Sequence, residues 1–244
     1  RAYQGVLRAI CEDTVKLHVG AQTAAVGCGD LTHDWFGEFL LLCHPPSINA
    51  VALHAGMRGG SVRRLAEFIS QGIERVPGAA ARLRTVPRVA PVTEVAAAPV
   101  PPEGAPYAEL KDLEQCAGLA LGSPGRFGNM AAPLKHFLEG SGALWHRGVL
   151  AGKPACVFTS TGSMHGGQET TLMSMMLPLL HHGMLIVGLP YTRVELNATR
   201  EGGGPYGASH VAGIANDRPF AEDERALCIA QGRRLAEIAL KLAP

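Results

Sequence analysis

The sequence predicts an α/β protein built on a doubly wound, five-stranded parallel sheet with helices on both faces. Five short apolar runs alternate with segments of helical periodicity and with glycine-rich loops. A strand, a helix and a second strand stand at the start of this pattern, which favours a parallel sheet. Ligands of such sheets bind beyond the carboxyl ends of the strands, so the loops that follow strands are the candidate sites.

Helical spacing is clearest from Val62 to Ile73, and this helix is expected to end near Pro77. A last helix begins with the acidic turn 222–224. The glycine-rich stretch 201–213 before it is expected to be a loop. Further helical segments are expected at 107–114, through Leu134 and Leu138, and in the Met-rich stretch 170–180. The expected strands are 50–55, 81–86, 118–121, 155–159 and 185–189.

Residues 1–48 carry no motif and are expected to form an N-terminal extension of uncertain order, ahead of one α/β domain over 49–244. They are either an added arm or sequence upstream of the true start, and the absence of an initiator methionine favours the second interpretation. Six prolines between 87 and 106 predict a long surface loop or a linker. The segments on either side resemble parts of one sheet, which favours an internal loop.

Composition excludes several classes of function. Lys and Arg number 22 and Asp and Glu 21, for a net charge of +1, so no strong field attracts nucleic acid or an anionic membrane. No apolar run is long enough for a membrane helix and no signal pattern opens the chain, so a cytoplasmic protein without membrane insertion is expected. The six cysteines lack CxxC and zinc-ligand spacings, which predicts buried free thiols and no metal site.

Three loops after strands could carry chemistry. In the first, 56–62, backbone N–H groups could converge on a phosphate at a helix N-terminus, although a tight turn without a ligand fits equally well. It lacks a Walker lysine and does not match GxGxxG. The second, 122–130, could hold backbone amides against a flat ring beside Phe127, or be an ordinary turn with Asn129 as a helix N-cap. The third, 160–169, allows close backbone approach to a ligand, or is a flexible surface loop.

Three further side chains each have two possible interpretations. Trp145 is either a stacking platform or a core residue. His181 and His182, at an expected helix end, are either ligand donors or structural residues. The sequence contains no GxSxG elbow and no HExxH helix.

Five segments occur in order: GSPGRFGNM (122–130), FLEGSGALW ending at Trp145, STGSMHGGQE (160–169), HHGMLIVGLPY (181–191) and GGGPYGASHVAG (202–213). Together they resemble the WrbA-type NAD(P)H:quinone oxidoreductases, over residues 50–244. The resemblance implies a flavodoxin-like fold, non-covalent FMN, NADH or NADPH as reductant, and a small-molecule quinone as electron acceptor. It also implies a homotetramer in which Trp145 closes a neighbour's site and the stretch Met173, Met175 and Met176 forms the interface.

The same resemblance assigns roles to residues of this chain. His181 matches the histidine beside the flavin and is the candidate for orienting or protonating the quinone. Trp145, Phe127 and Tyr206 match the walls of the quinone and nicotinamide site. The implied FMN-binding residues are Met57, Arg58, Gly59, Gly60, Ser61, Val62, Gly125, Arg126, Phe127, Asn129, Ser160, Thr161, Gly162, Ser163, Gly166, Gly167 and His181.

The phosphate loop departs from the family pattern. Met57 stands where the family has serine, Gly59 where it has an aromatic residue, and Ser61 where it has histidine. One hydroxyl and one aromatic contact are therefore missing, while Ser61 and Arg58 can supply a donor and a positive charge.

The expected function is two-electron reduction of quinones to hydroquinones by FMN, in two alternating half-reactions at one site. That reaction avoids the superoxide-generating one-electron product, so a role against oxidative stress is implied. One alternative is a flavodoxin-type electron carrier, which the net charge of +1 disfavours because such carriers present an acidic face. The other is a cofactor-free scaffold, motivated by the altered phosphate loop.

Overall fold

The computed structural model describes residues 17–19, 22–24, 48–54, 60–87, 89 and 105–243. The chain divides into two units, Arg1–Pro45 and Pro46–Pro244. In the first unit, strands β1 (Leu17–Val19) and β2 (Gln22–Ala24) pair in antiparallel fashion. All further elements belong to the second unit.

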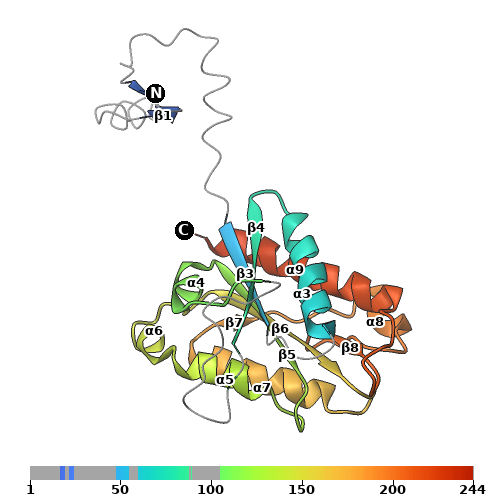
Figure 1. The fold of residues 1–244 in the computed structure, drawn as a ribbon. Coiled ribbons are helices and arrows are strands. Elements are labelled where there is room, and N and C mark those ends of the chain that lie inside the picture. The colour runs from blue at the N-terminus through green and yellow to red at the C-terminus, as the bar shows by residue number, and fades with distance from the viewer. Residues whose placement is uncertain are drawn as a thin grey trace, which may run out of the picture. The chain divides into compact units, whose positions relative to one another are not determined.

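A parallel sheet forms the centre of the second unit (Figure 1). Its strands run in the order β4-β3-β5-β6, and β7 and β8 both pair with β6. This order is doubly wound, because the chain starts in the middle of the sheet and builds outward in both directions. The predicted fold class is confirmed. The strands are β3 (Ile48–His54), β4 (Ala79–Thr85), β5 (Gly118–Pro124), β6 (Pro154–Thr161), β7 (Leu185–Ile186) and β8 (Ala208–Val211).

The fifth position of the sheet is shared by two short strands. β7 pairs with Pro154 and Ala155 of β6, whereas β8 pairs with the later residues Phe158 to Thr161. The expectations of one strand over 185–189 and of a loop over 201–213 were therefore wrong. β8 has no apolar run to reveal it, since its central residues Ser209 and His210 are polar and yet buried.

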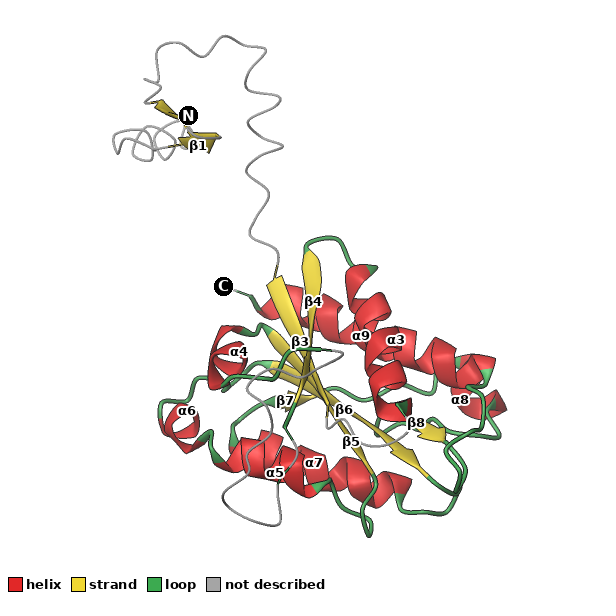
Figure 2. Cartoon of the chain, in the orientation of Figure 1, coloured by secondary structure: helices red, strands yellow, loops and turns green. Residues whose placement is uncertain are grey.

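Side chains alternate between the two faces of the sheet, as a period of two requires. Ala50 and Ala52 of β3 pack with the helices of one face, and Val51 and Leu53 pack with those of the other. Figure 2 shows the helices on both sides of the sheet. One face carries α3 (Ser61–Glu74) and α9 (Glu222–Leu242). The other helices are α4 (Leu110–Gln115), α5 (Ala132–Glu139), α6 (Gly142–His146), α7 (Gln168–His181) and α8 (Val194–Ala198).

Two glycines let α3 and α9 approach each other closely. A Cβ atom on Gly72 would overlap the carbonyl oxygen of Ile229, and one on Gly232 would overlap that of Ile69. Each helix thus places a glycine against the other's backbone, which fixes where the N-termini of both helices lie at the edge of the sheet.

The proline-rich stretch begins and ends at one place in the sheet. Thr85 at the end of β4 accepts a hydrogen bond from Ala108 N–H and donates its own N–H to Pro106. Residues 88 and 90–104 lie outside the described residues, but the stretch is internal to one domain because β4 and β5 share a sheet. The expected helix 107–114 begins only at Leu110, since Tyr107 forms a bridge with Thr85.

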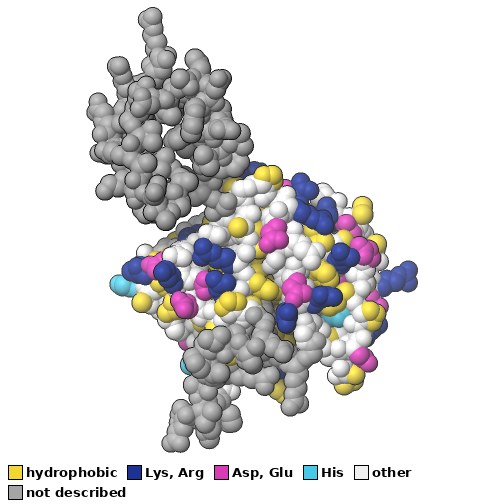
Figure 3. All heavy atoms as spheres, turned by 45° about the horizontal axis from the view of Figure 1, so that its top comes forward, with side chains coloured by type: hydrophobic (Ala, Val, Ile, Leu, Met, Phe, Trp, Pro, Cys, Tyr) yellow, Lys and Arg dark blue, Asp and Glu magenta, His cyan; other side chains and the backbone are white. Residues whose placement is uncertain are grey.

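Charges of both signs are mixed on the surface that Figure 3 turns forward, which agrees with the near-zero net charge. No helix in the described part of the chain is both long and apolar enough to cross a bilayer.

A buried carboxylate joins β8 to the start of α9. Glu224, 1% exposed, accepts hydrogen bonds from the backbone N–H groups of Gly202 (2.8 Å), Val211 (3.3 Å) and Ala221 (2.9 Å). His210 Nδ1 donates a fourth at 2.8 Å, and the His210 ring stacks on Phe220. Burial alone would raise the pKa of Glu224, but the hydrogen bonds from His210, Ala221 and Gly202 outweigh it and lower the pKa below 4.5.

The Glu224→Gln variant should lose about 2 to 3 kcal/mol of unfolding free energy at pH 7, because an amide NH2 would face the donors that now share a carboxylate oxygen. The pKa of Glu224 is lower in the folded chain than in the unfolded chain. Its ionised carboxylate therefore stabilises the fold fully above the unfolded pKa near 4.5, and this stabilisation is lost as the pH falls. Urea unfolding at pH 7 and pH 4 should therefore show a smaller difference from wild type at pH 4. A difference that stays constant would contradict the charged role of Glu224.

Candidate functional site

A hollow lies at the carboxyl ends of the strands, where the doubly wound order predicts a ligand. Four segments line it: the start of α3, the turn after β5, the end of β6 and the loop after β8. Its lining residues are Gly60, Ser61, Val62, Arg63, Pro124, Gly125, Arg126, Ser160, Thr161, Gly162, Ala212, Gly213, Ile214 and Asn216. We call this the first hollow.

The start of α3 brings a helix N-terminus to one end of the first hollow. Gly60 precedes the helix with φ +75°, a left-handed conformation that suits glycine, and no side chain caps the helix there. The first backbone N–H groups of α3 therefore remain available for an anion. The expected residues Gly60, Ser61 and Val62 lie at this end, while Met57, Arg58 and Gly59 lie outside the described residues.

The turn after β5 contributes Gly125 and Arg126 to the lining of the first hollow. Backbone hydrogen bonds in both directions between Arg126 and Asn129 (2.8 and 3.0 Å) close the turn. Gly125 N–H donates to the carbonyl of Ser160 at 2.9 Å, which ties the turn to β6. Phe127 stands at the tip with φ +51° and its side chain fully exposed, so it does not line the first hollow.

The end of β6 contributes Ser160, Thr161 and Gly162. Thr161 Oγ1 donates to the carbonyl of Ser163 at 2.8 Å, and Gly166 N–H donates to the same oxygen at 3.1 Å. Gly167, at φ +86°, packs against Gly128 of the neighbouring turn. The expected residues Ser163, Gly166 and Gly167 thus shape the loop and hold it against the turn, rather than lining the hollow.

The loop after β8 is a wall that the sequence interpretation missed. Ala212 N–H donates to the carbonyl of Thr161 at 2.8 Å, which places the loop beside the end of β6. Asn216 adopts a left-handed φ of +57°, and its Oδ1 accepts a hydrogen bond from Ser61 Oγ at 2.8 Å, across the hollow. Ile214 stands at the rim, almost fully exposed. The available signal was Gly213 followed by Asn216, two residue types that tolerate positive φ.

Trp145 and His181 lie together, but not in the first hollow. Trp145 Nε1 donates to the backbone carbonyl of His181 at 2.8 Å, and both residues line a separate hollow between α5, α6 and α7. Asn129 also lines this second hollow and is not the N-cap of α5, which is Ala131. Tyr206, half-exposed in the turn before β8, lines neither hollow.

The neighbouring His182 is structural. Its Nε2 lies 2.9 Å from Ser141 Oγ, and that hydroxyl donates to the carbonyl of Leu138, so the imidazole Nε2–H is the donor. Burial and the nearby His181 lower the pKa of His182. A neutral His182 therefore links the start of α6 to the end of α7, which fixes the position of Trp145 beside His181.

Thiol and metal chemistry have no support in the described part of the chain. Burial raises the pKa of Cys116 to about 11 and that of Cys156 to about 12, and it also raises that of Cys228. These thiols stay protonated and shielded from solvent. The described residues contain no group of three or more His, Cys, Asp or Glu side chains that could hold a metal ion.

Comparisons with solved structures agree with this geometry. The WrbA-like flavodoxin of Agrobacterium tumefaciens superposes with a TM-score of 0.55 at 20% identity, over 81% of this chain and 99% of that one. The oxidised flavodoxin 1 of Bacillus cereus superposes with a TM-score of 0.51 at 17% identity, over 78% and 97%. At these identities the likeness establishes the flavodoxin-like fold alone.

Sequence comparisons reach further. A relative from Syntrophus aciditrophicus, named NAD(P)H dehydrogenase (quinone), is 44% identical over 190 residues, which are 75% of this chain and 94% of the relative. A relative of the same name from Geobacter sulfurreducens is 42% identical over 190 residues, with the same coverage. The model of the NADPH-dependent FMN reductases matches residues 48–195, from β3 to the start of α8. The chain therefore belongs to the NADPH-dependent FMN reductase family.

Proposed function

We propose that the protein is an FMN-dependent NAD(P)H:quinone oxidoreductase that reduces quinones to hydroquinones. The observation that carries the proposal is the first hollow, which joins an uncapped helix N-terminus to two backbone-lined turns at the switch edge of a flavodoxin-like sheet. Relatives 42–44% identical bear the name of this activity. The unit Pro46–Pro244 carries the reaction.

The residues of the first hollow fit FMN. The N-terminus of α3 suits its phosphate, with Ser61 Oγ as a further donor. Gly125 and Gly162 have no side chain, so the backbone of both turns can reach a flat ring system. Thr161 and its neighbours place backbone amides where negative charge on the reduced ring would be stabilised. Bound FMN would supply the redox chemistry, accepting a hydride from the nicotinamide and returning two electrons to the quinone.

A second copy of the chain completes the site. Trp145 is more than half exposed to solvent and His181 is exposed, and they lie on a surface with Met173, Leu177 and Leu180, which are each more than half exposed. Such a patch is typical of an interface. The expected interface residues Met175 and Met176 are wrong in detail, since Met175 is fully buried and Met176 packs against the core. We propose a homotetramer in which this surface faces the first hollow of a neighbour.

The setting is proposed to be cytoplasmic, because the three described cysteines are free thiols and the reductant is an intracellular nucleotide. An electron carrier is less well supported, since side chains of both signs are mixed on the face that Figure 3 turns forward and the net charge of the chain is +1.

Filling the first hollow should weaken flavin binding without unfolding the chain. A Cβ at Gly162 would meet no atom closer than 3.6 Å, and φ there is not positive, so Gly162→Val should fold. Its methyl groups would occupy cofactor space, and FMN affinity should fall about 10- to 100-fold. Flavin fluorescence quenching measures the change. Gly204→Val, which also has open space around it but lies outside the hollow, is the control. Equal affinity of both variants would place FMN elsewhere.

Removing the imidazole of His181 should lower quinone turnover while leaving FMN bound. A loss of about 10²-fold in kcat with benzoquinone is expected for His181→Ala, since general acid catalysis contributes at least that much. Stopped-flow kinetics should show flavin reduction by NADH little affected and reoxidation by quinone slowed. His146→Ala, another exposed histidine on the adjacent helix α6, should behave as wild type. Unchanged reoxidation in His181→Ala would remove its role.

A charge on the exposed apolar face of α7 should dissociate the proposed tetramer. Leu177, 61% exposed, lines the second hollow, and Leu177→Asp should convert a tetramer to smaller species because a charge would be buried in an apolar interface. Light scattering after size-exclusion chromatography reports the mass, and quinone reduction should fall with it. The exposed Leu242 at the end of α9 provides the control Leu242→Asp. A wild-type monomer at micromolar concentration would contradict the assembly.

A further inference from the structure

A third, polar hollow adjoins the end of the first hollow that holds the N-terminus of α3. The two share Gly60, Ser61, Arg63 and Asn216, so a ligand lying over the first can continue into the third. The third hollow has a volume of about 370 Å³, a size typical of small-molecule sites.

Three arginines and two carboxylates line the third hollow. Arg63, Arg64 and Arg218 outnumber Glu67 and Asp217, so 3 − 2 leaves one positive charge. Arg63 Nε and Arg64 Nη1 bond Glu67 at 2.9 and 3.3 Å, and Arg218 Nη2 bonds Glu201 at 3.2 Å. The three arginine side chains are about half exposed or more. Exposed ion pairs of this kind contribute little to stability, so a phosphate can replace the carboxylates at little cost.

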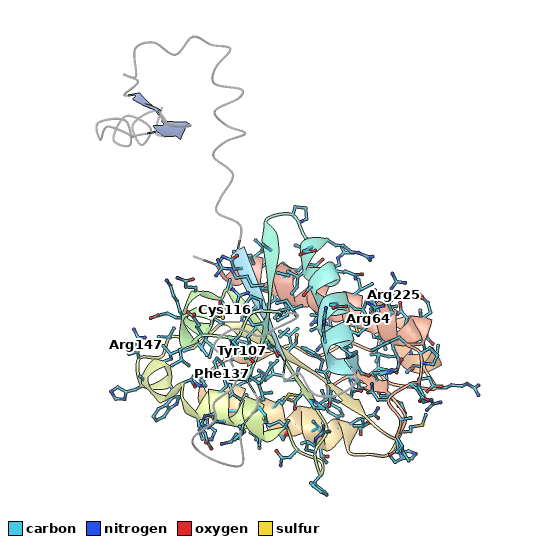
Figure 4. The ribbon with its side chains drawn as sticks, viewed as in Figure 1. Arg64, Tyr107, Cys116, Phe137, Arg147 and Arg225 are labelled. Atoms are coloured by element: carbon cyan, nitrogen blue, oxygen red, sulfur yellow. The ribbon has the colours of Figure 1, made fainter. Side chains whose placement is uncertain are left out.

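Aromatic rings lie beside the arginines of the third hollow and contact one another. Phe220 lines it, with its ring stacked on His210 at 3.8 Å and edge-on to Phe68 at 5.4 Å. The guanidinium carbons of Arg64 and Arg225 lie 5.7 and 5.5 Å from the centre of the Phe68 ring. Figure 4 shows these two arginines coming from α3 and α9. Guanidinium groups stacked on rings lose less entropy when they bind a phosphate.

We propose that the third hollow binds the phosphorylated adenosine end of NADPH, with Arg64 and Arg218 contacting its 2′-phosphate. This inference rests on the proposed function, which places a nicotinamide over the flavin ring beside Gly125 and Gly162. The rest of the dinucleotide would then pass over the bound FMN at the mouth of the first hollow and reach the arginines of the adjoining third hollow. Arginine pairs well with a phosphate and gains little from the hydroxyl that NADH carries there, so the site favours NADPH over NADH.

The boundary between the hollows favours two ligands over one. The hydrogen bond from Ser61 Oγ to Asn216 Oδ1 spans the junction at 2.8 Å, and Ser61 is the first residue of α3. It lies between the phosphate end of the first hollow and Arg64 and Arg218, which line the third hollow alone. A flavin that continued into the third hollow, as FAD would, must break this bond, whereas a nicotinamide dinucleotide can pass over it.

Titration of the FMN-loaded protein with 2′,5′-ADP and with ADP tests the proposal by calorimetry. The wild type should bind 2′,5′-ADP at least tenfold more tightly, and the Arg64→Ala, Arg218→Ala double variant should lose this preference. In steady-state assays the ratio of KM for NADPH to KM for NADH should rise about 10- to 100-fold in the double variant, as expected for losing charged hydrogen bonds. Arg233→Ala is the control, because Arg233 is equally exposed and pairs with Glu237 at 2.8 Å on α9.

Equal binding of the two nucleotides by the wild type would overturn the proposal, as would an unchanged KM ratio in the double variant. Tighter binding of FAD than FMN by the apoprotein, lost in the double variant, would also overturn it and assign the hollow to the flavin. The titration needs no turnover. An arginine-dependent preference for 2′,5′-ADP in a protein that reduces no quinone would uphold the third hollow while refuting the proposed function.

Discussion

The loop that closes the cofactor hollow depends on one buried carboxylate. Glu224 binds the backbone on both sides of residues 212–220, at Val211 and at Ala221, and it also holds Gly202 before β8. The loop is therefore closed by the same side chain at both ends. That closure adds to the pairing of β8 with β6 and to the hydrogen bond from Ala208 N–H to Gln231, and it helps to keep Gly213 and Asn216 opposite Ser61. The geometry of the site is thus set from a position that contacts no ligand.

Where apolar residues alternate with loop signals, the sequence predicted the structure well. β3, β5 and β6 are buried on both faces, so each contains a short apolar run that is easy to recognise, at 50–53, 119–121 and 155–158. β8 escaped because its buried polar residues are satisfied by partners distant in the sequence, His210 by Glu224 and the β8 backbone N–H of Ala208 by Gln231. No local pattern can report hydrogen bonds made across 14 or 23 residues. The loop after β8 was not expected to line the site because β8 itself was not predicted.

The expected site residues also fall into two groups, those whose position follows from a preceding strand and those whose position does not. Gly125, Thr161 and Gly162, which are expected to bind FMN through their backbone, line the first hollow, because the strand that precedes each of them fixes its position. Trp145 and His181 are expected to act through their side chains, and within one chain they line a different hollow. Resemblance between sequences reports that residues serve one site, but not that they serve it from one chain. Their shared exposure beside an apolar face of α7 is what points to a neighbouring subunit.

A site built from backbone groups also accounts for the departures in the phosphate loop. Methionine and glycine in place of serine and an aromatic residue remove side chains, but they leave the N–H groups at the start of α3 in place. Ser61 has a further role, since its hydroxyl bridges to Asn216 and so joins α3 to the loop after β8. A histidine there would be too large for the same short bond. The changed residue at position 61 and the left-handed Asn216 are therefore parts of one arrangement, in which a contact between protein segments replaces a larger side chain.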